Sequence, residues 1–289
     1  MKLLALVLLL SSFSSLTVME VVKSFKNVCS DFFIHTANDI IIPTIFPGHQ
    51  YKMICQRWKD KYRFATVYDT VRRIPVYSAY TFLQAGTTVR RNSWKFEPQL
   101  ENIKKYKDKK EMIVSPTKKG QIVNQAVNSD YSDTVFTRGH LFPCQFAADQ
   151  DQADSTFTLT NAAPQTQSSN QNWDKCVETP MLNEINQDCI LNQNHQAYIV
   201  TGVVPGKNWI PITRKGKEYQ KGINIPSHFW SAYCCTSNKG QLVARAYIAE
   251  QENFKVKHSN IQDLNTELTD LYNEIPFNVF PGIDCNERK

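Results

Sequence analysis

The segment from Thr137 to Glu178 restricts the possible folds of this chain most strongly. Residues 135–137 alternate like the end of a strand, and the glycine of Arg138-Gly139-His140 permits a sharp exit that can present the histidine at a surface. A second strand-like run covers residues 156–160 and leads directly to Asn161. The segment therefore predicts two short strands, with a histidine on the first and an asparagine after the second.

A helix is expected to follow over residues 170–186, because polar N-cap candidates stand at its beginning. At 100° per residue, the side chains of Asn170, Asp174 and Glu178 lie within about 80° of one another. One face of this helix can therefore be directed toward His140.

This combination of side chains suits the hydrolysis of phosphodiester bonds. A neutral imidazole such as that of His140 can activate water. The amide oxygen of Asn170 suits a hard cation such as Mg²⁺, which keeps most of its water ligands. Arginine offers a planar fork for phosphate oxygens. Each residue type alone is usually an ordinary surface polar group, so the prediction depends on their joint order and spacing.

The segment resembles the DNA/RNA non-specific endonuclease family of His-Me finger (ββα-metal) nucleases, and the similarity extends over roughly residues 55–282. The matching motifs are Arg138-Gly139-His140 for the family's Asp-Arg-Gly-His box, Thr160-Asn161 with Pro164-Gln165 for its Thr-Asn-x-x-Pro-Gln segment, Asn170 through Trp173 to Glu178 for its metal helix, and Arg91-Asn92-Ser93-Trp94-Lys95 for its upstream arginine segment. Residues 197–204 and 225–235 resemble later core strands of the family, and residues 73–82 resemble one subgroup of it. The resemblance implies an α+β fold with an antiparallel sheet and flanking helices, stapled by disulfides.

The resemblance also implies roles for individual residues. His140 would be the general base, and Asn170 would bind Mg²⁺ directly, with Mn²⁺ as an alternative metal. Glu178 would orient metal-bound water. The substrate would be DNA, RNA or both, cut without regard to sequence.

Arg91 and Arg138 would stabilise the charge on the phosphorane, and Asn161 would fix the loop of His140 and the metal shell by hydrogen bonds. One position departs from the family pattern, because Thr137 stands where the box usually has an acidic residue. Threonine can hydrogen-bond but cannot neutralise Arg138. This departure leaves two interpretations open. The protein is either an active nuclease with an altered charge environment around His140 and Arg138, or an inactive pseudonuclease that acts as an extracellular nucleic-acid or protein binding module.

The N-terminus has the three parts of a secretory signal peptide. Met1-Lys2 is followed by an apolar run over residues 3–10 and by small residues. The run is too short to span a bilayer, and we expect cleavage between Ser14 and Glu20. The sequence thus predicts a secreted, extracellular protein without stable membrane association.

The eight cysteines fit an oxidising compartment and predict disulfides. Their spacings do not resemble a zinc site. The expected pairs are Cys29 with Cys55, Cys176 with Cys189, and Cys234 or Cys235 with Cys285. For Cys144, a disulfide is favoured over a role as a nucleophile.

The net charge of +6 and the pI near 8.8 favour a polyanionic partner, although both values are mild for a nucleic-acid-binding domain. Lysines concentrate over residues 104–110. This cluster is interpreted as a solvated loop face that could also attract phosphate. A third possibility, a disulfide-stapled ligand or adhesion protein in which the His-Asn pattern is chance, is disfavoured by the motifs.

No internal repeat or low-complexity linker divides the chain. We expect a signal peptide over 1–19, an N-terminal extension over 20–55, the endonuclease domain over 56–282 and a tail over 283–289. Within the domain, the patterns predict strands at 64–82 (with a turn near 69–70), 197–204, 229–235 and 241–248, and helices at 100–110 and 261–272. Trp173, Trp209 and Trp230 are expected in the core or in pocket walls.

Overall fold

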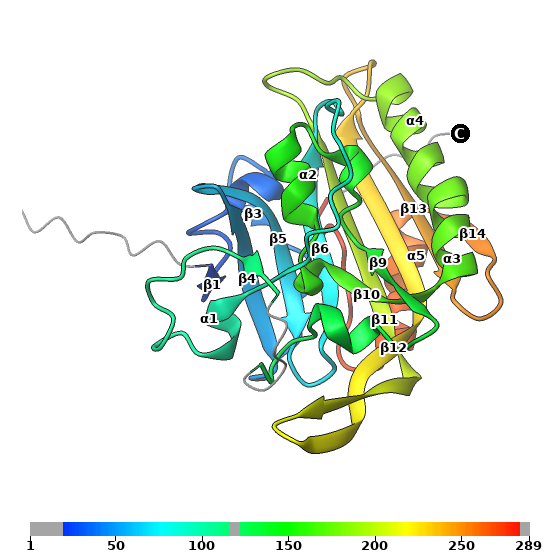
Figure 1. Cartoon of the computed structure of the whole chain (residues 1–289). Coiled ribbons are helices and arrows are strands. Elements are labelled where there is room, and N and C mark those ends of the chain that lie inside the picture. The colour runs from blue at the N-terminus through cyan, green and yellow to red at the C-terminus, as the bar shows by residue number, and fades with distance from the viewer. Residues whose placement is uncertain (1–19, 116–121, 284–289) are drawn as a thin grey trace, which may run out of the picture.

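The computed structural model describes residues 20–115 and 122–283, and its main element is an eight-stranded antiparallel sheet (Figure 1). The strand order is β1-β4-β5-β6-β11-β12-β13-β14. The strands are β1 (Val21–Val22), β4 (Tyr51–Trp58), β5 (Lys61–Asp69), β6 (Ile74–Phe82), β11 (Ala197–Arg214), β12 (Lys217–Thr236), β13 (Leu242–Glu250) and β14 (Val256–Ser259). The long β11–β12 hairpin extends well beyond the body of the sheet.

Side chains alternate between the two faces of the sheet, and each face is covered by its own hydrophobic core. On β12, Phe229 and Tyr233 belong to one core, whereas Trp230 and Ala232 belong to the other. Three layers result, with helix α4 (Thr179–Asp188) in front of the sheet and helix α5 (Ile261–Tyr272) behind it in Figure 1. The expected α+β class is confirmed.

The remaining elements are short and lie around this sheet. They are the strand pairs β2 (Ile34–His35) with β3 (Ile40–Ile41), β7 (Lys95–Phe96) with β8 (Ile113–Val114), and β9 (Phe136–His140) with β10 (Ala162–Thr166), the helices α1 (Pro98–Glu101), α2 (Gln150–Thr156) and α3 (Gln167–Trp173), and the 3-10 turns at Ser30–Phe32, Asn128–Tyr131, Cys144–Phe146 and Leu159–Asn161.

The helix predicted over 170–186 is present but begins earlier, at Gln167, where the hydroxyl of Thr166 accepts a hydrogen bond from the Ser169 N–H. A π-helical turn, Asp174–Glu178, separates α3 from α4. Pro180 explains this turn, because its nitrogen cannot donate to the preceding helical turn and the widened backbone removes the conflict.

Two local predictions were wrong. The second strand of the motif is 162–166 and not 156–160, because α2 ends at Thr156 and the side chains of Thr158 and Thr160 turn inward to the carboxylate of Glu97. The helix predicted over 100–110 is limited to α1, and turns follow it. Residues 104–110 are mostly lysine, with one aspartate, so this segment buries little apolar surface that could stabilise a helix.

The other core predictions were confirmed. The helix over 261–272 has the expected limits. The strands predicted at 64–82, 197–204, 229–235 and 241–248 correspond to β5–β6, β11, β12 and β13, and β13 begins one residue later than predicted. Trp173 and Trp230 are buried in the two cores, and Trp209 lines a pocket.

The disulfides only partly follow the expectation. Cys29 pairs with Cys55 as predicted, but Cys189 pairs with Cys235 and not with Cys176. Cys176 is exposed on the π-helical turn, whereas Cys189 lies where the end of α4 meets β12. Among the described residues, Cys144 also forms no disulfide, contrary to expectation. Cys285 lies outside the described residues, as does the expected signal peptide.

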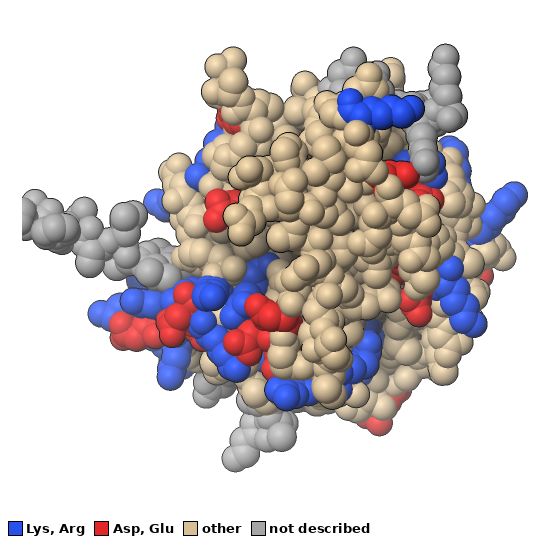
Figure 2. Space-filling view, turned by 90° about the horizontal axis from the view of Figure 1, so that it is seen from above, with Lys and Arg blue, Asp and Glu red and all other residues tan. Residues whose placement is uncertain are grey.

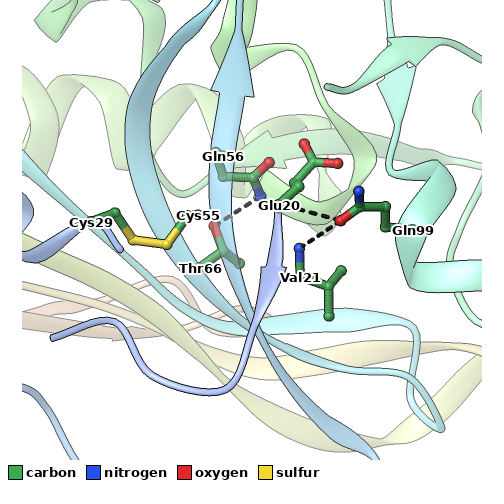
Figure 3. The surroundings of a disulfide bond; sticks show 7 residues. All are labelled: Glu20, Val21, Cys29, Cys55, Gln56, Thr66 and Gln99. Atoms are coloured by element: carbon green, nitrogen blue, oxygen red, sulfur yellow. Dashed lines mark hydrogen bonds between the residues drawn. A yellow bond between two sulfur atoms is a disulfide. The ribbon is translucent and has the colours of Figure 1, made fainter. Parts of the chain in front are cut away.

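The N-terminal extension is fastened to the sheet beside the Cys29–Cys55 bond. The backbone N–H groups of Glu20 and Val21 both donate to the side-chain oxygen of Gln99 (Figure 3). This arrangement draws the carboxyl group of Glu20 into the interior, where its oxygens find no hydrogen-bond partner among the described residues.

No helix in the described part of the chain is both long and apolar enough to cross a membrane. Figure 2 shows basic and acidic side chains intermixed at its lower left and a broad area without charged side chains across its centre. The net charge of +6 is therefore not spread as a single-sign field over this face.

Candidate active site

The β9–β10 hairpin and the following helix form the expected strand–strand–helix unit. In the hairpin, His140 lies opposite Ala162, and Thr166 at the end of β10 caps α3. Gly139 is required here, because a Cβ at this position would come within 2.2 Å of the side-chain oxygen of Gln165. The hairpin thus places the histidine next to the first turns of the helix.

A polar pocket of about 270 Å³ opens between this hairpin and the helix. It brings together three of the predicted residues, His140, Asn170 and Glu178. The pocket is also lined by Arg90, Pro143, Cys144, Gln145, Gln171 and Asp174. Asn170, Asp174 and Glu178 therefore share one helix face, as their spacing predicted, despite the inserted π-helical turn.

The imidazole of His140 is almost completely buried at the bottom of this pocket. Its ring packs against Trp94 and Phe157, at centroid distances of 5.0 and 4.8 Å. Burial, reinforced by the charge of Arg90, lowers the pKa of His140 to about 3, against the opposing effect of a hydrogen bond to the Arg138 backbone. His140 is thus neutral at physiological pH, and its Nε2 has no hydrogen-bond partner among the described residues.

Asn170 is oriented by the residue that departs from the family pattern. Its Nδ2 donates to the hydroxyl oxygen of Thr137 at 3.0 Å, and this hydroxyl donates in turn to the backbone oxygen of Gln165 at 2.8 Å. Because the amide nitrogen is engaged, the amide oxygen of Asn170 remains for a ligand.

Two carboxylates lie further along the same helix. Gln145 Nε2 donates to Asp174 Oδ1 at 3.0 Å and to Glu178 Oε2 at 2.9 Å. Burial, and secondarily the negative charge of Asp174, raise the pKa of Glu178 to about 8. Without a cation in the pocket, Glu178 is therefore mainly protonated at neutral pH.

The arginines near the site lie in different environments. Arg90 lines the pocket, with its guanidinium 5.1 Å from the centroid of Phe157 and its Nη1 3.8 Å from the Cys144 sulfur. Arg91 instead pairs with Asp154 at 3.2 Å. Among the described residues, neither Arg91 nor Arg138 belongs to the pocket lining.

Arg138 lies beside the pocket, on the same strand as His140. Its guanidinium stands over the rings of Tyr131 and Trp94, at 5.0 and 5.5 Å, and donates to the Asn128 oxygen at 2.8 Å. Its Nε is buried without a partner among the described residues. Arg138 and His140 therefore share Trp94 as a common wall.

Asn161 is fully buried under the loop that follows His140. Its Oδ1 accepts hydrogen bonds from the Ser78 hydroxyl and the Phe142 N–H, and its Nδ2 donates to the oxygens of Phe142 and Thr156. These contacts hold the loop after the histidine. Asn161 is not among the described residues that line the pocket.

The pocket suits a hard cation better than a soft one. Within the described residues, no group of three or more His, Cys, Asp or Glu side chains could hold a metal ion. The side chains with oxygen donors that line the pocket include the amide of Asn170 and the carboxylates of Asp174 and Glu178. A cation with oxygen ligands and retained waters, such as Mg²⁺, fits this set.

Sequence reasoning missed Arg90 and Gln145 as pocket residues, and it placed Asp174 on the helix face of Asn170 and Glu178 without assigning it a role. Asp174 carried a usable signal, since it lies one helical turn after Asn170. Arg90 and Arg91 are adjacent and chemically identical, so only the packing of the chain separates them. Gln145 carried no signal, because its contacts join segments 29 and 33 residues apart.

The sheet, the strand–strand–helix unit and the convergence of His140, Asn170 and Glu178 define the ββα-metal class of nuclease folds. The chain matches the DNA/RNA non-specific endonuclease family over residues 49–284, and it belongs to this family.

Individual relatives agree with this assignment. The chain is 33% identical to human endonuclease domain-containing 1 protein over 231 residues, which cover 78% of this chain and 41% of that protein. It is 29% identical to human mitochondrial endonuclease G over 135 residues, or 43% of this chain and 42% of that protein. The chain thus spans about two fifths of the length of these relatives.

Among solved structures, the fold is similar to a chain in the crystal structure of the EndoG/EndoGI complex, which concerns the mechanism of EndoG inhibition. The TM-score is 0.54 at 15% sequence identity, and the match covers 80% of this chain and 90% of that chain. At this level of identity the likeness concerns the fold.

Proposed function

We propose that this protein is a secreted, Mg²⁺-dependent endonuclease that hydrolyses phosphodiester bonds of DNA, RNA or both without sequence specificity. One observation carries the proposal. His140, whose Nε2 is buried without a partner among the described residues, lines the same pocket as Asn170 and Arg90. A base, a metal ligand and a phosphate-binding cation therefore meet in one site.

In this proposal His140 accepts a proton from the attacking water at Nε2. Burial lowers the pKa of His140, so the ring is unprotonated at physiological pH and can accept a proton. The walls formed by Trp94 and Phe157 hold the ring in position and keep bulk water from its faces.

Asn170 would hold the cation through its amide oxygen, in the orientation set by Thr137, and Glu178 would orient water bound to that cation. When bound, Mg²⁺ would supply positive charge for a phosphoryl oxygen and for the leaving oxygen. Such a charge also favours the ionised form of Glu178.

The arginines would stabilise the charge of the phosphorane. Arg138 is retained from the sequence-based prediction, and its half-buried guanidinium lies beside the base. Arg90 is the cation that the pocket itself contains, and we assign to it the phosphate contact that was expected of Arg91. Asn161 would support catalysis by fixing the loop after His140.

The experiment is a plasmid-nicking assay with the secreted protein, in Mg²⁺ and in EDTA, alongside His140→Ala and the control His49→Ala. His49 is exposed and lies outside the pocket. We expect metal-dependent nicking that is lost by several orders of magnitude in His140→Ala and retained in His49→Ala. Nucleic-acid binding without nicking under any divalent metal would instead support the pseudonuclease.

Secretion is tested separately. The disulfides Cys29–Cys55 and Cys189–Cys235 suit an oxidising compartment and support the proposal. Expression in animal cells should release the protein into the medium with a new N-terminus between residues 14 and 20. Retention of residues 1–19 on the released or cellular protein would contradict the signal peptide.

A further inference from the structure

Two lysine-rich segments far apart in the sequence have no role in the proposed active site. One is the loop after α1, over residues 104–110, and the other is the tip of the β11–β12 hairpin. Together they carry seven lysines against two acids, Asp108 and Glu218: Lys104, Lys105, Lys107, Lys109, Lys110, Lys215 and Lys217. None of the seven forms an ion pair with another described residue, in contrast to Lys59 with Asp151 or Lys257 with Glu267.

The two segments come together in the folded chain. Lys105 and Tyr106 from the loop and Lys215 from the hairpin tip line one shallow hollow of about 340 Å³, with residues 101, 102, 123 and 124 as its floor. We call this surface the lysine platform, defined by residues 104–110 and 215–217.

A buried network holds both halves of the platform in a fixed relation. Next to Lys215, the fully buried Arg214 makes two hydrogen bonds to the carboxylate of Asp130, at 2.7 and 2.6 Å, and also donates to the Ile122 oxygen. At the loop side, the carboxylate of Glu101 accepts the backbone N–H groups of 123 and 124. Residues 122–124 thus connect the hairpin tip to the base of the loop.

Aromatic rings lie among the lysines. Lys105 stands over the ring of Tyr106 at 5.1 Å, and Lys217 stands over the ring of Tyr219 at 5.4 Å. Clustered lysines attract the phosphate backbone of nucleic acid without regard to sequence. Rings interleaved with such lysines are also typical of surfaces that bind single strands.

The platform shares its frame with the strand that carries His140. The turn Asn128–Tyr131 contains Asp130, which holds Arg214, and its Asn128 and Tyr131 contact Arg138. The turn that holds Arg214 beside the platform therefore also contacts the strand that carries His140.

We propose that the lysine platform is an accessory binding surface for the phosphate backbone of the nucleic acid, separate from the hydrolytic pocket. The inference rests on the proposed function and deepens it, since it assigns substrate holding and bond cleavage to different places. The positive charge of the lysine platform, whose lysines form no ion pairs with other described residues, complements the phosphates of a nucleic-acid backbone. The lysines contact phosphates without distinguishing between bases.

The test compares the full chain with two charge-removing variants. Lys215→Gln/Lys217→Gln alters the hairpin tip, and Lys239→Gln/Lys255→Gln removes the same charge at exposed positions outside the platform. Binding of a fluorescent duplex of about 40 base pairs, long enough to span several phosphate contacts, is measured by anisotropy in EDTA at several salt concentrations. Plasmid cleavage is measured in Mg²⁺.

For the platform variant we expect the slope of log Kd against log salt to decrease by about 0.9 for each phosphate that the protein no longer neutralises, with an increased KM on plasmid and an unchanged kcat. The control variant should behave like the wild type in all three measurements. Equal slopes and KM values for the two variants would overturn the platform, even if the wild type cuts DNA. A reduced slope in a protein that never cuts would support the platform while overturning the proposed nuclease.

Discussion

Thr137 and Asn170 are joined by a hydrogen bond of 3.0 Å, in which the amide nitrogen of Asn170 donates to the threonine hydroxyl. The position that departs from the family pattern thus still performs one task of an acceptor, because it fixes which end of the amide faces the pocket. The acidic residue usual in the family could accept the same hydrogen bond. Threonine at position 137 is therefore expected to leave the amide of Asn170 in the same orientation.

Thr137→Val tests the orientation. Valine has a similar shape but no acceptor, so the amide of Asn170 is free to turn and its oxygen no longer faces the pocket. We expect the rate and the apparent Mg²⁺ affinity to fall together by about 10-fold to 100-fold, as for other residues that orient metal ligands. Thr137→Ser should remain close to the wild type in a Mg²⁺ titration of plasmid nicking. Equal activity of the valine and serine variants would contradict the role of this hydrogen bond.

The adjacent arginines provide a matched pair. Arg90→Ala removes the cation that lines the pocket, and we expect kcat to fall by about 10²-fold to 10³-fold, as for removal of one donor to a developing negative charge. Arg91→Ala breaks an ion pair between a largely exposed guanidinium and the mostly buried carboxylate of Asp154, and we expect kcat to fall by less than about tenfold. Single-turnover cleavage at saturating metal measures both values. The reverse order would return the phosphate contact to Arg91.

Asn161→Ala should act on stability. It removes a fully buried side chain with four hydrogen bonds and leaves their partners unsatisfied, which costs on the order of 3 kcal/mol. The control Asn186→Ala removes an exposed side chain with a single hydrogen bond, to the Leu182 oxygen, and should have little effect. Urea unfolding of both variants compares the decreases in stability. Similar decreases in the two variants would mean that the buried network contributes little.

Glu20 gives the protein a predictable pH dependence of stability. Burial, and next the nearby carboxylate of Glu97, raise the pKa of Glu20 well above 4.5 in the folded state. Between the unfolded and the folded pKa, the folded chain holds a proton that the unfolded chain releases. The free energy of unfolding therefore decreases as the pH rises from about 4.5 toward the folded pKa. The slope for one proton is at most about 1.4 kcal/mol per pH unit.

Glu20→Gln isolates this contribution, because the amide is neutral at every pH. The stability of the variant relative to the wild type should increase between about pH 5 and about pH 8, as measured by urea unfolding. A difference that stays constant or shrinks over this range would show that Glu20 is ionised in the folded protein.

Much of the fold was predictable from local patterns. The apolar residues of 261–272 recur at helical spacing. In the strands of the main sheet, apolar and polar residues alternate or apolar residues form runs. The spacing of apolar residues was therefore enough to predict these helices and strands. The region 156–160 misled the prediction because its threonines have strand-like character, whereas in the fold their hydroxyls serve the buried Glu97.

Periodicity, the order of one short motif and the family resemblance that the motif carries were enough to predict the α+β class, the strand–strand–helix unit and the meeting of His140, Asn170 and Glu178. Three features became evident only from the packing of the folded chain. Cys189 bonds Cys235, Arg90 enters the pocket in place of Arg91, and Glu20 and Glu178 have raised pKa values. Disulfide pairing, pocket lining and desolvation all depend on which distant segments pack together, and a linear pattern does not contain those contacts.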